Sequence, residues 1–338
     1  MAVRQSIYLE RFKLGQGKMF NKFLLELKDN FNKLLYRSKY KTLDALTKVE
    51  LNKLLVELRQ SQLSIYNNYT SELIAMLQAF MKADVQIAKL GMTSILSNEE
   101  SDDDYSNQYI EENKESNSLF GIAWLTSNNY DSLWSSINNK PIGIDGQLPP
   151  VLISGFVAAS ASAFENLLRL GYTNGLTPDE VSGLAFDLEN AYGNVGVSKK
   201  IFNNSKALSE TLITNVHVLS TAGVASVLFS AYIWHSIIDG RTSNICRSRN
   251  NNVYEYGKGP LPPAHNWCRS IILSVYGAFN GDSLPGSLYS WVVSQPDDVI
   301  ADMFNASELS ELKETGKLTL ADTLSLSEYR NKLNNLLK

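Results

Sequence analysis

The sequence predicts a predominantly helical α+β protein with long antiparallel N-terminal helices and a C-terminal domain in which helices flank a small β-sheet. Three observations predict this class. Neither Gly nor Pro interrupts residues 18–90, which favours long helices. Apolar residues recur there at spacings of three and four, the helical period. Two β-type runs, 232–238 and 270–276, bracket a stretch rich in turn-forming residues.

Length and charge distribution divide the chain. A chain of 338 residues suggests about two compact domains. Residues 1–96 carry 15 Lys and Arg against 8 Asp and Glu, whereas residues 97–119 carry 1 against 8. We therefore expect an N-terminal helical arm over 1–96, an acidic loop and linker region over 97–149, and a C-terminal α+β domain over 150–338. Proline and glycine at the end of the linker favour a boundary there.

Two helices are expected in the arm. The first covers residues 17–38, where an apolar stripe is opposed by a lysine-rich face. The second begins near Thr47, because Thr47 and Glu50 have the spacing of a capping box. Its apolar pattern extends to about Gly91. The basic face indicates either solvation or contact with an acidic partner.

The middle of the chain changes from acidic to apolar. Residues 97–118 have no face to bury, so we expect a mobile acidic loop. An Ala- and Ser-rich helix is expected over 151–170. Thr177 followed by proline and then Glu180 predicts the start of another helix. A further helix is expected from about Ser205 to Phe229.

The apolar run 217–238 is long enough to cross a membrane. It contains many Ser, Thr and His side chains, so we expect a buried helix followed by a strand, with no membrane contact. No apolar core of the signal-peptide type follows the N-terminal methionine, and two cysteines make no disulfide framework. These features favour an intracellular setting.

After the second strand, the chain is expected to form short helices. Pro296 is expected in a helical first turn, and Gly316 is expected to end the helix that precedes it. The last helix is expected near 327–338, with an apolar face that includes Tyr329 and Leu333.

The stretch between the strands gathers the chemically versatile residues. Cys246, His265 and Cys268 are zinc-type ligands, and Asp239 offers an oxygen. Ser243 stands where another cysteine would complete a Cys-x-x-Cys pair, so three strong ligands are left. We therefore expect a packed structural knot with no cofactor. A zinc site and a Cys–His nucleophile, which would make the protein an enzyme, are the open alternatives.

The same stretch is basic and aromatic. Five basic residues against two acidic ones give residues 239–270 a net charge of +3. Guanidinium groups and aromatic rings suit both nucleic acid and protein interfaces. The candidate contact residues for DNA or a partner protein are Arg247, Arg249, Lys258, Tyr254 and Trp267.

The order of these residues resembles the C-terminal domain of tailed-phage minor head proteins, the phage Mu F-like head morphogenesis family. That family's pattern is roughly Asp-x-x-Thr-Cys-x-x-Cys, a spacer, and then Pro-x-x-His-x-x-Cys-x-Cys. The positions that carry the resemblance, and that we expect to form the knot, are Asp239, Arg241, Thr242, Cys246, His265, Cys268 and Arg269. Ser243 and Ser270 depart from the pattern, because each replaces a cysteine.

The end of the chain is also similar to that family. Leu288-Tyr-Ser-Trp291, then Gln295-Pro296 and later Gly316 follow its aromatic-x-x-Trp, Gln-Pro and Gly order. The resemblance covers residues 150–325 and does not extend to the N-terminal helices.

The resemblance implies a structural function without catalysis. A protein of this kind is a bacteriophage virion component that supports head morphogenesis and procapsid assembly, with a further role in genome packaging or ejection. Its partners would be the portal protein or the major capsid protein, with packaged DNA as an additional one, and several copies would join a larger assembly. It would lie in the head interior or at the portal vertex, and in the host cytoplasm during assembly. A metal-dependent or Cys/His enzyme, nuclease-like or transferase-like, and a DNA-binding module are the alternatives.

Overall fold

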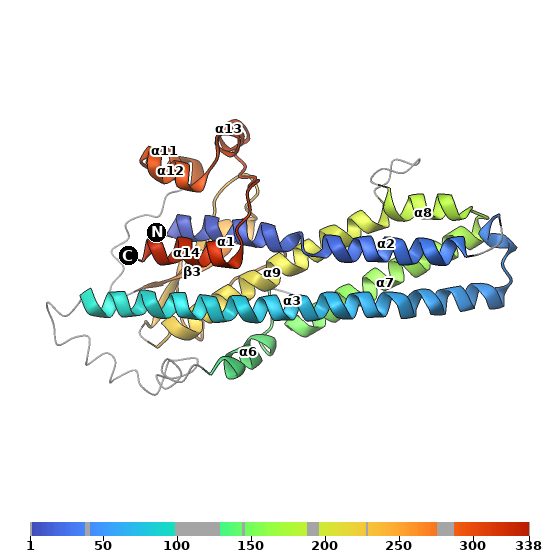
Figure 1. Ribbon diagram of the computed structural model, residues 1–338. Coiled ribbons are helices and arrows are strands. Elements are labelled where there is room, and N and C mark those ends of the chain that lie inside the picture. Colours follow the sequence, from blue (N-terminus) through green and yellow to red (C-terminus); the bar gives the residue numbers. More distant parts are fainter. Residues whose placement is uncertain are drawn as a thin grey trace. The chain divides into compact units, whose positions relative to one another are not determined.

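The fold is the predominantly helical α+β class that the sequence predicts (Figure 1). The computed structural model describes residues 2–37, 41–98, 129–143, 146–187, 196–227, 229–275 and 287–337. Contacts divide the chain into two compact units. Unit 1 comprises residues 1–16, 77–149 and 210–338, and unit 2 comprises residues 17–76 and 150–209.

These units differ from the three consecutive segments expected from the sequence. One division, after Pro149, coincides with an expected boundary, whereas those after Gln16, Met76 and Ser209 fall within helices. Periodicity identifies a helix but not the core against which each part of it packs. A unit boundary inside a continuous helix therefore leaves no signal in the sequence. Residues 99–128 lie outside the described part of the chain, and with them most of the expected acidic loop.

Unit 2 contains the antiparallel helices expected of the arm. Helix α2 (Phe20–Tyr36) is followed by a short helix η1 (Leu43–Ala45) and by α3 (Lys48–Asn98). Across α2, its C-cap and α3, Lys22 pairs with Glu72 at 2.6 Å and Arg37 with Glu57 at 2.7 Å. The residue numbers of the partners on α3 decrease as those on the α2 side increase, so the two segments are antiparallel.

The two capping boxes expected in this unit are confirmed, whereas the helix expected from about Ser205 to Phe229 is α9 and spans Val197–Ala225. The backbone N–H of Glu50 donates to Thr47 Oγ1 at 3.2 Å, and that of Thr47 donates to the Glu50 carboxylate at 2.8 Å. The same reciprocal pair joins Thr177 and Glu180 at the start of α8 (Pro178–Phe186). Each pair satisfies two backbone donors that a helix N-terminus otherwise leaves without a partner.

Aromatic rings hold the helices of unit 2 together. Phe20 lies 4.8 Å from Tyr69 and 5.6 Å from Phe156, which belongs to α7 (Pro149–Thr173). Farther along α2, Phe31 lies 5.2 Å from Phe164. The ring pairs therefore link α2 to α3 and to α7.

Helix α7 is, among the described residues, the one helix long and apolar enough to cross a membrane by length and composition. A third of its most apolar window is buried within the protein. Core helices of soluble proteins pass the same test, so this is weak support for a membrane span. The apolar run 217–238 instead forms the end of α9 (Val197–Ala225) and a strand, as expected.

Unit 1 contains the sheet and the short helices. Beyond parts of α3 and α9, its described elements are α1 (Ala2–Gly17), α6 (Tyr130–Asn138), β1 (Ala231–Ser236), α10 (Asn244–Arg249), β2 (Val253–Glu255), β3 (Ser270–Val275), α11 (Leu288–Val293), α12 (Asp297–Met303), α13 (Ala306–Thr315) and α14 (Leu326–Leu336). The sheet is antiparallel in the order β2-β1-β3, with Trp234 opposite Ile272. Gly316 ends α13 in the left-handed conformation, as the sequence predicts.

The core of unit 1 includes a helix that the sequence did not reveal. Phe12 of α1 stacks on Phe80 of α3 at 4.8 Å and lies 5.5 Å from Tyr329 of α14. Helix α1 also buries Arg11 and Lys13. Buried cations obscure the apolar stripe by which an amphipathic helix is recognised, so α1 was not expected.

His235 on β1 supplies a test of this core. Its side chain is buried, and neither ring nitrogen has a hydrogen-bond partner among the described residues. Burial lowers the pKa of His235 to about 4, against an ordinary value near 6.5. The folded state thus binds fewer protons than the unfolded state, and stability falls as the pH drops from about 6.5 towards 4.

We therefore expect the His235→Leu protein to gain stability relative to the native chain by about 3 kcal/mol between pH 7 and pH 4. Urea unfolding of both proteins at a series of pH values measures the difference. A stability difference that does not change with pH would show that His235 is charged or hydrated in the fold.

Candidate functional site

The candidate site lies where β1 ends and β3 begins. Between these strands the chain forms α10 and β2, and then returns through the loop that carries His265. Ser243 caps α10 and accepts a hydrogen bond from the N–H of Cys246 at 3.3 Å. We call residues 239–270, which contain the seven residues expected to form the structural knot, the knot.

Asp239 is the centre of the hydrogen bonding in the knot. Its carboxylate accepts from Arg269 Nη1 at 2.9 Å, from the N–H of Arg241 at 2.8 Å and from the N–H of Leu318 at 2.9 Å. Burial raises the pKa of Asp239, but hydrogen bonds from Arg269 and from the backbone lower it by a larger amount. The pKa of Asp239 therefore lies below its ordinary value. Asp239 is therefore a buried, fully partnered anion. Thr242 adds a hydrogen bond from its hydroxyl to Ile237 O at 2.6 Å.

The C-terminal segments attach to this centre. The N–H of Leu288 donates to Ile238 O at 2.9 Å, and that of Gly240 donates to Gly316 O at 2.7 Å. The guanidinium of Arg241 donates to Leu318 O at 3.0 Å. Segments almost eighty residues apart in sequence are thus joined at Asp239 and its neighbours.

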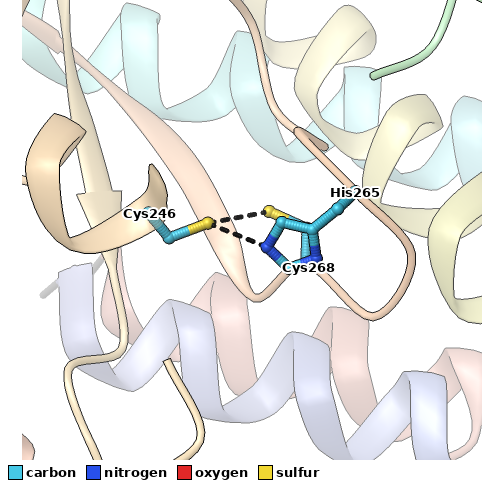
Figure 2. A group of neighbouring side chains, drawn as sticks. All are labelled: Cys246, His265 and Cys268. Atoms are coloured by element: carbon cyan, nitrogen blue, oxygen red, sulfur yellow. Dashed lines mark hydrogen bonds between the residues drawn. The ribbon is translucent and has the colours of Figure 1, made fainter. Parts of the chain in front are cut away.

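Cys246, His265 and Cys268 form a second centre, which we call the Cys/His cluster. Figure 2 shows the Cys246 sulfur directed at both of the other side chains. Cys246 Sγ lies 3.6 Å from Cys268 Sγ and 3.3 Å from His265 Nε2. All three ligand atoms lie within 4.8 Å of one another. Both cysteines are buried free thiols, and His265 is half-buried.

One hydrogen bond determines which nitrogen of His265 carries the proton. Nδ1 lies 2.7 Å from the carbonyl oxygen of Asn266. A carbonyl oxygen only accepts, so Nδ1 is the donor and Nε2 of the neutral ring presents a lone pair. That lone pair faces Cys246 Sγ and the hydroxyl of Ser243, which lies 2.7 Å away.

The two serines that depart from the family pattern also lie here. Ser243 contacts His265, as above. Ser270 Oγ lies 2.8 Å from Ser236 Oγ, and Ser236 donates to the carbonyl oxygen of Cys246 at 3.2 Å. Positions 243, 246, 268 and 270 of the pattern therefore meet around one point, with hydroxyls at two of them.

The paired sulfurs differ in acidity. A hydrogen bond from Cys268 lowers the pKa of Cys246 to about 6, in opposition to burial, and Ser243 and Ser270 lower it further. Donating that bond, together with burial, raises the pKa of Cys268 well above its ordinary value. Cys246 is thus the more acidic of the two sulfurs.

Trp267 adopts an unusual backbone conformation beside the cluster. The N–H of Cys268 donates to His265 O at 3.2 Å, which closes a turn, and Trp267 occupies its third position with φ of 58°. This position favours Gly or Asn, so a bulky residue there is strained. The turn holds His265 and Cys268 at adjacent corners of the cluster, while Trp267 remains 48% exposed.

The basic residues of the knot have partners within the protein. Arg247 donates to the carbonyl oxygens of Thr242, at 3.2 Å, and Asp239. Arg249 lies over the ring of Trp234 at 5.1 Å, and Lys258 pairs with Glu255. Each of these three side chains thus has a partner within unit 1, and Arg247 and Lys258 are exposed.

The aromatic candidates differ in the same way. Tyr254 is half-buried, with its ring 5.8 Å from that of Tyr232. Trp267, by contrast, is substantially exposed. Of the residues expected to contact DNA or a partner protein, Trp267 is the aromatic side chain that offers a free surface.

The geometry bears on the chemistry available to the cluster. A thiolate beside an imidazole resembles the nucleophile and base of a cysteine enzyme. However, Cys246 is 3% exposed and Cys268 is fully buried, so a substrate carbonyl has little access to either sulfur. Two soft sulfur ligands and a directed imidazole lone pair suit structural cross-linking or metal binding better.

A buried polar network in unit 1 was missed by sequence reasoning. Asp84 of α3 accepts from His217 Nδ1 at 2.8 Å and from the Tyr329 hydroxyl at 3.1 Å, and all three residues are buried. The available signal was a single carboxylate within the otherwise apolar and polar-uncharged run 83–88. It could not identify the partners, because they lie more than 130 residues away.

No family model matches this chain, and neither the curated proteins nor the solved structures searched contain a significant match. The function is therefore argued from the residues and their geometry.

Proposed function

We propose that this chain is a minor head protein of a tailed phage, similar to the phage Mu F-like head morphogenesis family, and that it acts in head assembly without catalysing a reaction. The observation that carries the proposal is that the residues of the family pattern lie together in the knot. Asp239, Arg241 and Arg269 share hydrogen bonds, and Cys246, His265 and Cys268 lie together at the Cys/His cluster.

Convergence matters because the matching pieces are short. Short motifs that match by chance have no reason to contact one another in three dimensions. Here the two departures, Ser243 and Ser270, also lie beside Cys246. The pattern therefore behaves as a single unit of structure, as a family signature should.

The C-terminal resemblance supports the same proposal. Leu288 begins its aromatic segment and bonds to Ile238, and Gly316 accepts a hydrogen bond from Gly240. The segments that resemble the family's ending are thus anchored on the knot. Buried cysteines and internally partnered arginines favour this structural role over the enzyme and DNA-binding alternatives.

Particles made by the phage or prophage that encodes this chain provide the test. We expect procapsids purified on a density gradient to contain the chain, together with portal and major capsid protein, at a low and constant copy number. Quantitative mass spectrometry of the gradient fractions measures that ratio. Procapsids and heads that lack the chain at every stage of assembly would refute the proposal.

A matched pair of variants distinguishes incorporation that depends on the knot from passive enclosure of the chain in the particle. Asp239→Ala removes the centre of the knot, whereas Asp298→Ala removes an exposed carboxylate of α12. We expect incorporation to fall for the first, because breaking a buried ion pair costs about 3–5 kcal/mol and shifts the folding equilibrium constant more than about a hundredfold toward the unfolded chain. Incorporation of the second should not change. Equal incorporation of both would indicate passive enclosure.

A further inference from the structure

We propose that Cys246, His265 and Cys268 form a Zn²⁺-binding site in this chain, with the fourth position beside Ser243. The inference rests on the geometry of the Cys/His cluster and is independent of the proposed head function. Sulfur and imidazole ligands of this kind select zinc, whereas calcium and magnesium require oxygen ligands.

Two of the three distances between the ligand atoms match a tetrahedral ion. Zn–S bonds of about 2.3 Å and Zn–N bonds of about 2.0 Å give tetrahedron edges of about 3.8 Å between sulfurs and about 3.5 Å between sulfur and nitrogen. The corresponding separations are 3.6 Å for Cys246 Sγ to Cys268 Sγ and 3.3 Å for Cys246 Sγ to His265 Nε2. These two edges lie within about 0.2 Å of the tetrahedral values. The third pair, Cys268 Sγ and His265 Nε2, lies within 4.8 Å, and closing that edge to about 3.5 Å would place the three atoms around one ion.

The orientation of His265 suits a metal ligand. Metal-bound histidines usually donate their other ring N–H to a carbonyl or carboxylate oxygen, which fixes the ring and its tautomer. His265 Nδ1 makes that bond to Asn266 O at 2.7 Å. Nε2 then directs its lone pair to the space shared with the two sulfurs.

The backbone places the ligands from two short segments. His265 and Cys268 are held by the turn that contains the strained residue Trp267, and backbone strain of this kind clusters at functional sites. Cys246 comes from the first turn of α10, which Ser243 caps. An ion there would cross-link α10 to the start of β3.

The remaining ligand is a hydroxyl or a solvent molecule. Ser243 Oγ lies 2.7 Å from His265 Nε2 and closes the fourth side of the cluster. A site with three protein ligands and one weak ligand binds zinc less tightly than a site with four strong ones. Zinc binds both sulfurs as thiolates, so protons compete with the ion and affinity decreases as the pH falls.

The full chain, purified under reducing conditions and stripped with a chelator, is titrated with Zn²⁺ against a chromophoric competitor. We expect one ion per chain, and the Co²⁺ form should show the visible and thiolate charge-transfer absorption of a tetrahedral sulfur site. His265→Gln should lower affinity by about 100-fold or more, because loss of a residue that merely orients a ligand already costs 10–100-fold. Trp267→Ala, in the same turn, should retain binding.

A gain-of-affinity pair keeps the test valid if His265→Gln does not fold. Ser243→Cys supplies a third thiolate, which is a fourth strong ligand at the cluster, whereas Ser248→Cys places a thiol on the exposed side of α10. We expect Ser243→Cys to bind zinc at least about tenfold more tightly than Ser248→Cys. Equal affinities for this pair would overturn the proposal. A reduced, folded native chain that takes up no stoichiometric zinc would overturn it as well.

Discussion

Asp239→Ala is expected to destabilise the protein by about 3–5 kcal/mol, the cost of breaking a buried ion pair by removing one partner. The side chain of Asp239 is fully buried and that of Arg269 is 11% exposed. Without the carboxylate, Arg269 keeps a buried charge, and the N–H groups of Arg241 and Leu318 lose their acceptor. Urea unfolding monitored by tryptophan fluorescence at pH 7 measures the loss.

The stabilisation that Asp239 provides depends on pH. Its folded pKa lies below the ordinary value near 3.9, so its stabilisation is present above that value and is lost as the pH falls through the folded pKa. The difference between native and Asp239→Ala proteins should therefore shrink in strong acid. Asp298→Ala, an exposed control on α12, should change stability by less than about 1 kcal/mol. An Asp239→Ala loss equally small would mean that Asp239 does not hold the knot together.

Arg11→Met is expected to cost about 3–5 kcal/mol, for a related reason at a different place in unit 1. Arg11 of α1 binds Glu308 of α13 through two hydrogen bonds of 3.0 Å and 2.6 Å, and both side chains are buried. Loss of Arg11 leaves a buried carboxylate and also removes donors from Met303 O. Thermal or urea unfolding of the variant measures the effect.

A double-mutant cycle distinguishes charge from packing. The Arg11→Met, Glu308→Leu double variant should be more stable than either single variant, because two apolar side chains replace the buried pair without leaving a lone charge. Arg4 provides the control: it pairs with Asp302 at 3.1 Å, but both side chains are about a third exposed. Arg4→Met should therefore cost less than about 1 kcal/mol. Strictly additive losses at Arg11 and Glu308 would contradict the argument.

Local sequence signals predicted much of the local structure. The capping boxes at Thr47 and Thr177 and the left-handed stop at Gly316 lie where expected, because each depends on residues within one helical turn. The strands expected over 232–238 and 270–276 are β1 and β3, with slightly shorter bounds. The third strand, β2, has three residues and no resolvable alternation, so it was not expected.

Long-range pairing was not predictable in the same way. The arginines of the knot raised the expectation of phosphate contacts, since composition cannot reveal that Arg241 bonds to Leu318 or that Arg249 covers Trp234. Likewise, the sequence brought Cys246 and His265 into one candidate site but did not reveal that Gly316 joins the same unit through Gly240. Such contacts depend on the packing of distant segments, which a local pattern does not encode.

The most direct test of the proposed head function is a low-resolution cryo-electron microscopy map of the procapsid, reconstructed without imposed symmetry. Native particles and particles lacking this chain would be compared, with portal and major capsid protein present in both. We expect difference density inside the head at or near the portal vertex, large enough for a low number of copies. The proposed head function would be contradicted if the two maps were identical and the native particles contained no trace of the chain.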